Sequence, residues 1–208
     1  MKKILLFLLI IAIALVLLFT GMQEKRTVRV EALPWQVEML EGDRLAVMDV
    51  VLGESSVWAG IQAWNGRPDI GLFQGPDGDV RLEAYFGKSK IGRVVEEGQA
   101  AEKGERVFDA YIVARLGTTD EQMKAFFDAK LQKKPMPSGS YKFELPEKEL
   151  GDAHDLPITE LSVIPSTQFP KEVVIQRFGE PSSDRQLGEG RELLLFKDKS
   201  LAMILDSE

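Results

Sequence analysis

The chain lacks cysteine entirely: none of its 208 residues is one. This excludes a thiol nucleophile, a zinc site built on thiolates and a lipid-modified N-terminal cysteine. It leaves the compartment open, because an oxidising environment permits disulfides without requiring them. Histidine is nearly absent as well, with a single residue, His154.

Polar residues are missing from a long run near the start of the chain. Two lysines precede an apolar run, Ile4 to Phe19, that contains no polar side chain. A helix that continues to Met22 is about 28 Å long, close to the roughly 30 Å hydrocarbon core of a bilayer. A cleaved signal peptide is the alternative, but the Ala-x-Ala pattern at Ala12 to Ala14 lies inside the run. We therefore expect 1–22 to be a retained transmembrane signal anchor.

The orientation follows from the long domain after this helix, because long domains translocate largely regardless of flanking charge. We expect the N-terminus inside and the remainder exported. The Lys-Lys-Ile-Leu-Leu start is bacterial in style, which predicts a single-pass inner-membrane protein with a periplasmic C-terminal domain.

The exported part has a deficit of basic residues. Removing Lys2 and Lys3 from the 26 basic residues leaves 24 against 33 acidic ones, a net charge of −9. Nucleic acids and anionic lipid surfaces need a basic partner, so this charge disfavours both.

Hydrophobic periodicity predicts an α+β domain of mixed helices and antiparallel strands at 44–208, after a connector at 23–43. The expected strands are Arg44 to Leu52, Ile70 to Gln74, Asp79 to Phe86, Val107 to Leu116, Ser140 to Leu145, Pro157 to Ile164, Arg191 to Phe196 and Leu201 to Leu205. The expected helices are Ser56 to Asn65, one beginning at Thr118 or Thr119 with a buried stripe of Met123, Phe126, Phe127 and Leu131, a short turn at Pro146 to Leu150, and Phe169 to Phe178. Gly87 to Gly104 is expected to be an exposed loop.

Two segments share one order of elements. In 51–86 and in 164–205, a strand leads to a short helix, a Gly-x-Pro sequence and a hairpin, so the domain contains two candidate αββ units. A shift of 113 aligns Gly66 with Gly179 and Pro68 with Pro181. Gly and Pro also end helices in unrelated proteins, so both duplication and coincidence remain open.

The second segment resembles a known envelope module. Thr167 and Val173, then Phe178-Gly179-Glu180-Pro181, then Leu193 to Phe196 are similar to the capped helix, Gly-x-Pro and hairpin of the BamE (SmpA/OmlA) lipoproteins and of the β-lactamase inhibitor protein. Residues 53–86 resemble it more weakly. The resemblance implies a non-enzymatic protein-binding module and assigns no catalytic residue.

Three local patterns could carry chemistry. Asp152, His154 and Asp155 could supply metal ligands, but one histidine between two aspartates cannot enclose an ion alone. Gly75 to Asp79 contains the Asp-x-Asp of calcium loops without their later ligands, which favours a hairpin turn. We therefore predict no metal and no cofactor.

The third pattern is Ser140 near Lys142, which resembles the pair of a serine–lysine hydrolase. Such a lysine must be made neutral by burial. Alternation with Tyr141 and Phe143 instead places Lys142 on a polar strand face with Glu144.

Trp58 and Trp64 are the candidate binding residues. They lie six positions apart on one expected helix, which places one toward the core and the other toward the rim. Exposed tryptophan is enriched at protein interfaces. We expect a membrane-anchored, non-enzymatic envelope protein that binds another protein; the alternatives are a serine–lysine hydrolase and a ligand-carrying envelope domain.

The anchor hypothesis predicts that the protein stays in the membrane pellet after an alkaline carbonate wash, because an apolar helix of this length inserts stably. Fractionation and N-terminal sequencing test this. A mature N-terminus near Gln23 would contradict it.

Overall fold

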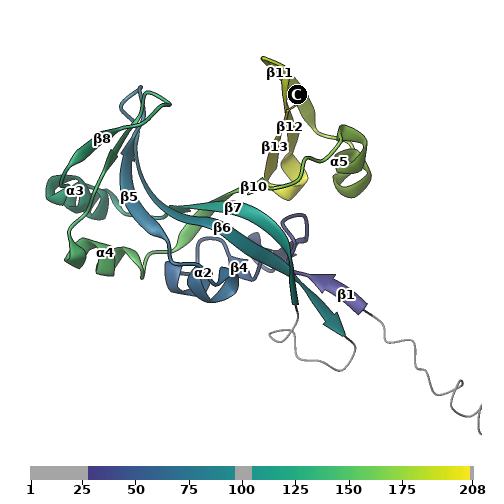
Figure 1. The fold of residues 1–208 in the computed structure, drawn as a ribbon, viewed down its shortest axis with the longest axis horizontal. Helices are drawn as coiled ribbons and strands as arrows, with labels where there is room; N and C mark the ends of the chain where they lie inside the picture. Colours follow the sequence, from purple (N-terminus) through teal and green to yellow (C-terminus); the bar gives the residue numbers. More distant parts are fainter. Residues whose placement is uncertain (1–27, 97–104, 207–208) are drawn as a thin grey trace, which may run out of the picture.

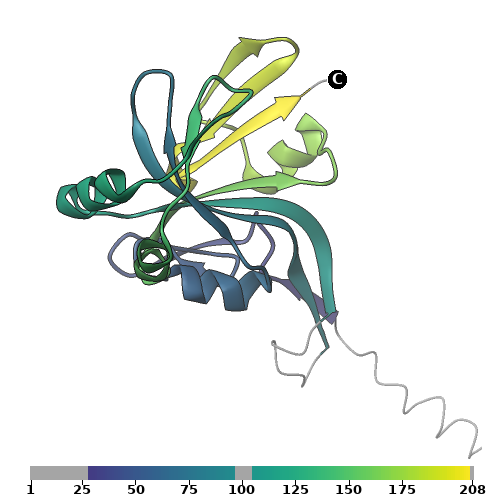
Figure 2. The same ribbon diagram turned by 60° about the vertical axis from the view of Figure 1, so that its left-hand side comes forward.

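The computed structural model describes residues 28–96 and 105–206. This part has an α+β fold with antiparallel sheets and four helices (Figures 1 and 2). The strands are β1 (Val28–Glu31), β2 (Val37–Leu40), β3 (Arg44–Val47), β4 (Val50–Val51), β5 (Asp69–Gln74), β6 (Val80–Glu96), β7 (Glu105–Leu116), β8 (Lys133–Pro135), β9 (Tyr141–Phe143), β10 (Ile158–Pro165), β11 (Ser183–Gly188), β12 (Arg191–Phe196) and β13 (Leu201–Asp206). The helices are α2 (Val57–Trp64), α3 (Asp120–Ala129), α4 (Glu147–Ala153) and α5 (Lys171–Phe178), and Lys197–Lys199 forms a 3-10 turn.

Within this described part, no helix is both long enough and apolar enough to cross a bilayer. The segment 1–22, which the sequence predicts to be the anchor, lies outside the described residues.

The largest element is a seven-stranded sheet with the order β10-β7-β6-β5-β9-β8, to which β1 adds beside the far part of β6. Here the prediction of a loop was wrong for 87–96, because β6 continues to Glu96. The remainder of the predicted loop, 97–104, lies outside the described residues. A bulge after Tyr85 and positive φ angles at Gly87 and Gly92 bend the strand instead of ending it. Ser89 and Ile91 are buried, but this short alternation is hidden among glycines and lysines in the sequence.

A second correction concerns Arg44 to Leu52, which is two strands and not one. β3 and β4 pair with each other, and β2 adds to them in a small three-stranded sheet. The turn is made by Met48 and Asp49, at φ 50° and 67°. Two consecutive positive φ values match the twist of a two-residue hairpin, but methionine gives no sequence signal for such a turn. Because β1 and β2 pair with other strands, the segment 23–43 is more than a connector.

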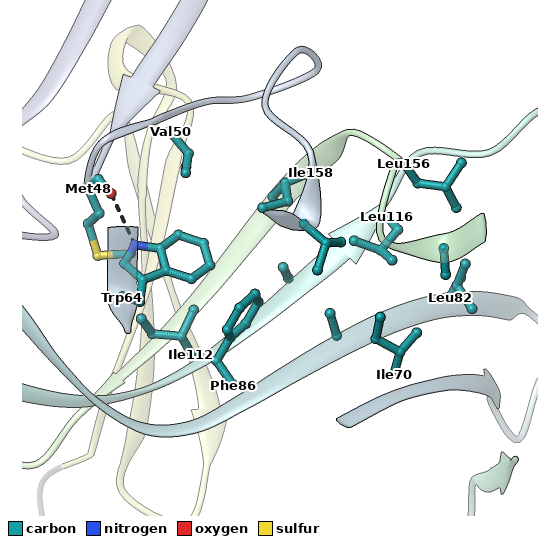
Figure 3. Packing of buried hydrophobic residues seen from close by; sticks show 14 of the residues in the cluster. Met48, Val50, Trp64, Ile70, Leu82, Phe86, Ile112, Leu116, Leu156 and Ile158 are labelled. Atoms are coloured by element: carbon teal, nitrogen blue, oxygen red, sulfur yellow. Dashed lines mark hydrogen bonds between the residues drawn. The ribbon is translucent and has the colours of Figure 1, made fainter. Parts of the chain in front are cut away.

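Trp64 joins three elements in the core (Figure 3). Its side chain is 2% exposed, and its indole Nε1 donates a hydrogen bond to the Met48 carbonyl at 3.0 Å. The ring meets Phe86 of β6 edge-on, with 4.7 Å between ring centroids. The last residue of α2 therefore fixes the β3–β4 turn against the large sheet.

The C-terminal residues form a smaller unit in which α5 packs on the sheet β11-β12-β13. Its buried core consists of Val174, Phe178, Leu194 and Phe196. The sequence predicted two strands here and missed β11, whose six residues are all exposed and whose composition is mostly polar. An edge strand without apolar alternation has no periodic signal.

An aromatic cluster ties this unit to the large sheet. The ring of Trp35 lies edge-on to Phe108 of β7 at 5.4 Å and to Phe169 at 5.5 Å. Both views show the β11–β13 sheet on the opposite side of the large sheet from α2 (Figures 1 and 2).

Of the two predicted starts of α3, Thr119 is confirmed as the capping residue: its side chain accepts from the Gln122 amide while the Gln122 side chain accepts from the Thr119 amide. Leu131 was wrongly placed in the buried stripe: the helix ends at Ala129 and Leu131 is exposed. The sequence also missed β8, a three-residue edge strand with two lysines and a proline.

Replacing Trp64 with Phe removes the indole N–H and leaves the buried Met48 carbonyl without that donor. We expect the free energy of unfolding to fall by about 2 kcal/mol, measured by urea titration with near-UV circular dichroism. Trp58→Phe is the matched control, since Trp58 lies on the same helix but is 52% exposed. Equal losses in the two variants would contradict the structural role of the Trp64 hydrogen bond.

Candidate functional site

The large sheet has one covered face and one open face. Alternate residues of β6 and β7, such as Ala84 and Ile112, are buried under α2, whereas Tyr85 and Tyr111 are exposed. Because neighbouring residues of a strand point to opposite faces, the side chains next to the buried ones share the other face. We call this the open face, and its residues are Phe73, Arg81, Glu83, Tyr85, Tyr111, Val113, Arg115, Lys142, Ser162 and Ile164.

Strand register places an apolar row on the open face. Tyr85 lies opposite Val113, and Val113 lies opposite Ser162. One step along, Tyr111 lies opposite Ile164. Tyr111 is 39% exposed and Ile164 is 58% exposed, so two large apolar side chains stand side by side in water.

Beside this row lies a row of alternating charge. Glu83 lies opposite Arg115, and Arg115 Nη1 is 3.7 Å from a carboxylate oxygen of Glu160. The Arg81 Nε is 3.7 Å from a Glu83 carboxylate oxygen. Burial raises the pKa of the Glu83 carboxyl above its ordinary value of 4.5, while Arg81 and Arg115 act in the opposite direction. Desolvation is the larger of these influences, so the ionised carboxylate is held at a cost to the fold.

A glycine allows Lys142 to lie across the sheet. A Cβ at Gly71 would come within 2.7 Å of the Lys142 Cε. The missing side chain therefore leaves room for the lysine, whose Nζ forms an ion pair with Asp69. The open face thus combines fixed charges of both signs with exposed aromatic rings. Of these groups, the aromatic rings and the arginines belong to the residue types that are enriched in protein interfaces.

The two candidate tryptophans lie in different surroundings. Trp64 is in the core, as described above. Trp58 is 52% exposed and its ring stacks on His154, with 4.6 Å between centroids. The burial agrees with the expectation of one core and one rim tryptophan, and the binding role stays a prediction for Trp58.

The remaining candidate residues have structural contacts. His154 follows α4, and its Nδ1 is 2.6 Å from the Leu150 carbonyl oxygen. Gly75 to Asp79 forms the predicted turn, closed by a hydrogen bond from the Gly78 amide to the Gly75 carbonyl. Among the residues that the structure describes, no group of three or more histidine and acidic side chains could hold a metal ion.

Lys142 reaches Asp69 and not the hydroxyl of Ser140 among the described contacts. The sequence correctly placed Lys142 on the polar face of its strand. It missed Glu83, Tyr85, Tyr111 and Ile164 as one surface, because their proximity depends on the register between β6, β7 and β10.

Comparison with family models, with curated proteins and with solved structures found no match for this chain. The resemblance to the BamE module therefore stays a prediction from the quoted residues.

The raised pKa of Glu83 has a consequence for stability. When the pKa of a carboxyl is higher in the folded than in the unfolded chain, the folded protein loses stability as the pH rises past 4.5. The loss is complete once the pH exceeds the raised pKa of the folded state. Glu83→Gln removes this cost, so we expect a higher Tm than wild type at pH 7 and a smaller difference at pH 4. Differential scanning calorimetry at both pH values measures this.

Glu160→Gln is the control, because it makes the same amide change in a neighbouring side chain that is 61% exposed. We expect little change in Tm at either pH. A lower Tm for Glu83→Gln at pH 7 would show that its ion pairs outweigh its desolvation.

Proposed function

We propose that this chain is a membrane-anchored, non-enzymatic protein of the bacterial cell envelope whose exported part binds another protein through the open face. The chain is held in the inner membrane by 1–22, with the later residues in the periplasm. This location rests on the apolar run from Ile4 to Phe19, on the long domain that follows it and on the bacterial style of the Lys-Lys-Ile-Leu-Leu start.

The observation that carries the binding function is the exposed row of Tyr85, Tyr111 and Ile164. Aromatic residues are enriched in interfaces, where they contribute large contact areas at low entropic cost. Arg81, Arg115 and Lys142 lie on one side of this row, where charged groups favour specific partners over non-specific apolar contact.

The proposal also includes a relation between the two segments of similar order, 51–86 and 164–205. It is supported by a longer shared order than the sequence predicted: α2 leads to β5-β6-β7, and α5 leads to β11-β12-β13, with neighbouring strands adjacent in the sheet in both cases. The starts of the second helix and of its first strand lie 114 positions after those of the first, at Val57 and Lys171 and at Asp69 and Ser183.

Packing within the two units supports the same relation. At this shift Trp64 corresponds to Phe178, and both are buried at the end of their helix. Trp64 packs on Phe86 and Phe178 on Phe196. The two phenylalanines also have equivalent places in their sheets. Phe86 follows Tyr85, which pairs with Asp69 at the start of β5. Phe196 follows Leu195, which pairs with Ser183 at the start of β11.

The Gly-x-Pro sequences themselves fit less well. The left-handed residue after α2 is Asn65, with φ 51°, whereas the residue after α5 is Gly179, with φ 82°. Gly66 and Gly179 therefore have different places in their turns, and the relation rests on strand order and packing.

The binding function predicts that Tyr111→Ala lowers recovery of the partner about tenfold or more, because an interface aromatic residue can contribute 2 kcal/mol or more. The measurement is quantitative mass spectrometry after crosslinking and affinity purification of the full chain from membranes.

Tyr141→Ala is the matched control: Tyr141 is 37% exposed on β9 of the same sheet, on the opposite strand face from Lys142. Equal recovery with both variants would refute binding through the open face. A cellular defect from Ser140→Ala, with the fold and the partner recovery preserved, would favour the hydrolase instead, because Ser140 is not part of the open face.

A further inference from the structure

Edge strands expose unpaired backbone groups, and proteins protect them with charge, proline, bulges or short length. In the described part, β8 has two lysines and a proline within three residues. β11 is polar and carries a register shift. β10 ends at Pro165, and its first residue exchanges backbone hydrogen bonds with Gly53 and Ser55. β2 and β4 are four and two residues long.

β13 has none of these protections over most of its length. Its sequence from Leu201 to Leu205 is wholly apolar, and only its last residue, Asp206, is charged. It pairs with β12 at all six positions without a register shift, and β12 is its only partner in the described part. Ile204, at 62%, is more exposed than any other large apolar side chain there.

The core beside β13 is also incomplete. Leu201, Met203 and Leu205 point toward the cluster of Val174 and Phe178, yet all three are only partly buried. They are the last side chains of the sheet on that side, so one more strand would cover them.

We propose that β13 pairs with β13 of a second copy of this chain, antiparallel and centred on Met203, which joins the two small sheets into one of six strands. This goes beyond the proposed function, because it concerns the edge of the small sheet and a second copy of the chain. In this register Leu201 lies opposite Leu205 and Ala202 lies opposite Ile204 of the other copy.

Charge and side-chain size favour this occupant. The pairs match apolar with apolar on both faces. Leu201 lies opposite a leucine of equal size, and Ile204 lies opposite the smaller Ala202. The two Asp206 carboxylates fall at opposite ends of the paired region, six positions apart, so like charges do not meet. A C2 interface requires this kind of self-complementarity.

The lack of native cysteine permits a direct test with the full chain in membranes. Met203→Cys places the two thiols directly opposite, where Cα atoms of an antiparallel pair lie about 4.5–5.5 Å apart, within the range of a disulfide. We expect most of the chain to run as a disulfide-linked dimer on a non-reducing gel after mild oxidation. Leu131→Cys is the control for random collision, because Leu131 is 54% exposed and lies outside this unit.

Two further variants test the register. Ile204→Cys alone should crosslink poorly, since diagonal neighbours are about 7–8 Å apart. Ile204→Cys co-expressed with Ala202→Cys should crosslink well, because these positions lie opposite each other.

A charge exchange tests pairing without disulfides. The double variant Ala202→Lys and Ile204→Lys changes only exposed side chains and places lysine opposite lysine, so it should be monomeric by analytical ultracentrifugation in detergent. The corresponding double glutamate variant should be monomeric as well, and a mixture of the two should form dimers.

Crosslinking of Met203→Cys no stronger than that of Leu131→Cys, or a monomeric wild-type chain at all concentrations, would overturn the proposal. These outcomes do not depend on how much partner the Tyr111→Ala variant recovers. A failure of the β13 pairing can therefore be told apart from a failure of binding through the open face.

Discussion

The hydrogen bond from the Trp64 indole to the Met48 carbonyl determines how three parts of the molecule meet. Met48 lies in a turn with two consecutive positive φ values, a conformation that methionine adopts at an energetic cost. The indole bond holds the turn at Met48, and the ion pair of Asp49 with Arg93 at 2.7 Å holds its second residue against β6. The small sheet, α2 and the long strand β6 are thereby fixed in one arrangement.

That arrangement decides which face of the large sheet is covered. α2 and the β3–β4 turn occupy the side of Phe86 and Ile112, so the side of Tyr85 and Tyr111 remains for other contacts. A buried core and an exposed surface are thus two consequences of the same alternation along β6 and β7. The bulge after Tyr85 bends β6 between the charged row near Glu83 and its far end.

Elements with strong local signals were predictable from the sequence. The capping box at Thr119 and the turn after Gly75 depend on neighbouring residues. The periodicity of β7 fits a strand or a helix, and only the run from Tyr111 to Val113 favoured the strand that the structure has. The turn at Met48, the polar strand β11 and the continuation of β6 past Gly87 depend on contacts with distant residues, which a single sequence does not reveal. The same holds for the open face, since Tyr111 and Ile164 meet only through strand register.

Trp35 lies near the start of the described chain, yet its ring contacts Phe169 and the Arg177 guanidinium close to the end. Because synthesis begins at the N-terminus, Trp35 cannot form these contacts until almost the whole domain has been synthesised. Such distant contacts slow folding, because the intervening chain must be ordered before they form. During this interval the nascent chain exposes an aromatic side chain that the native structure partly buries.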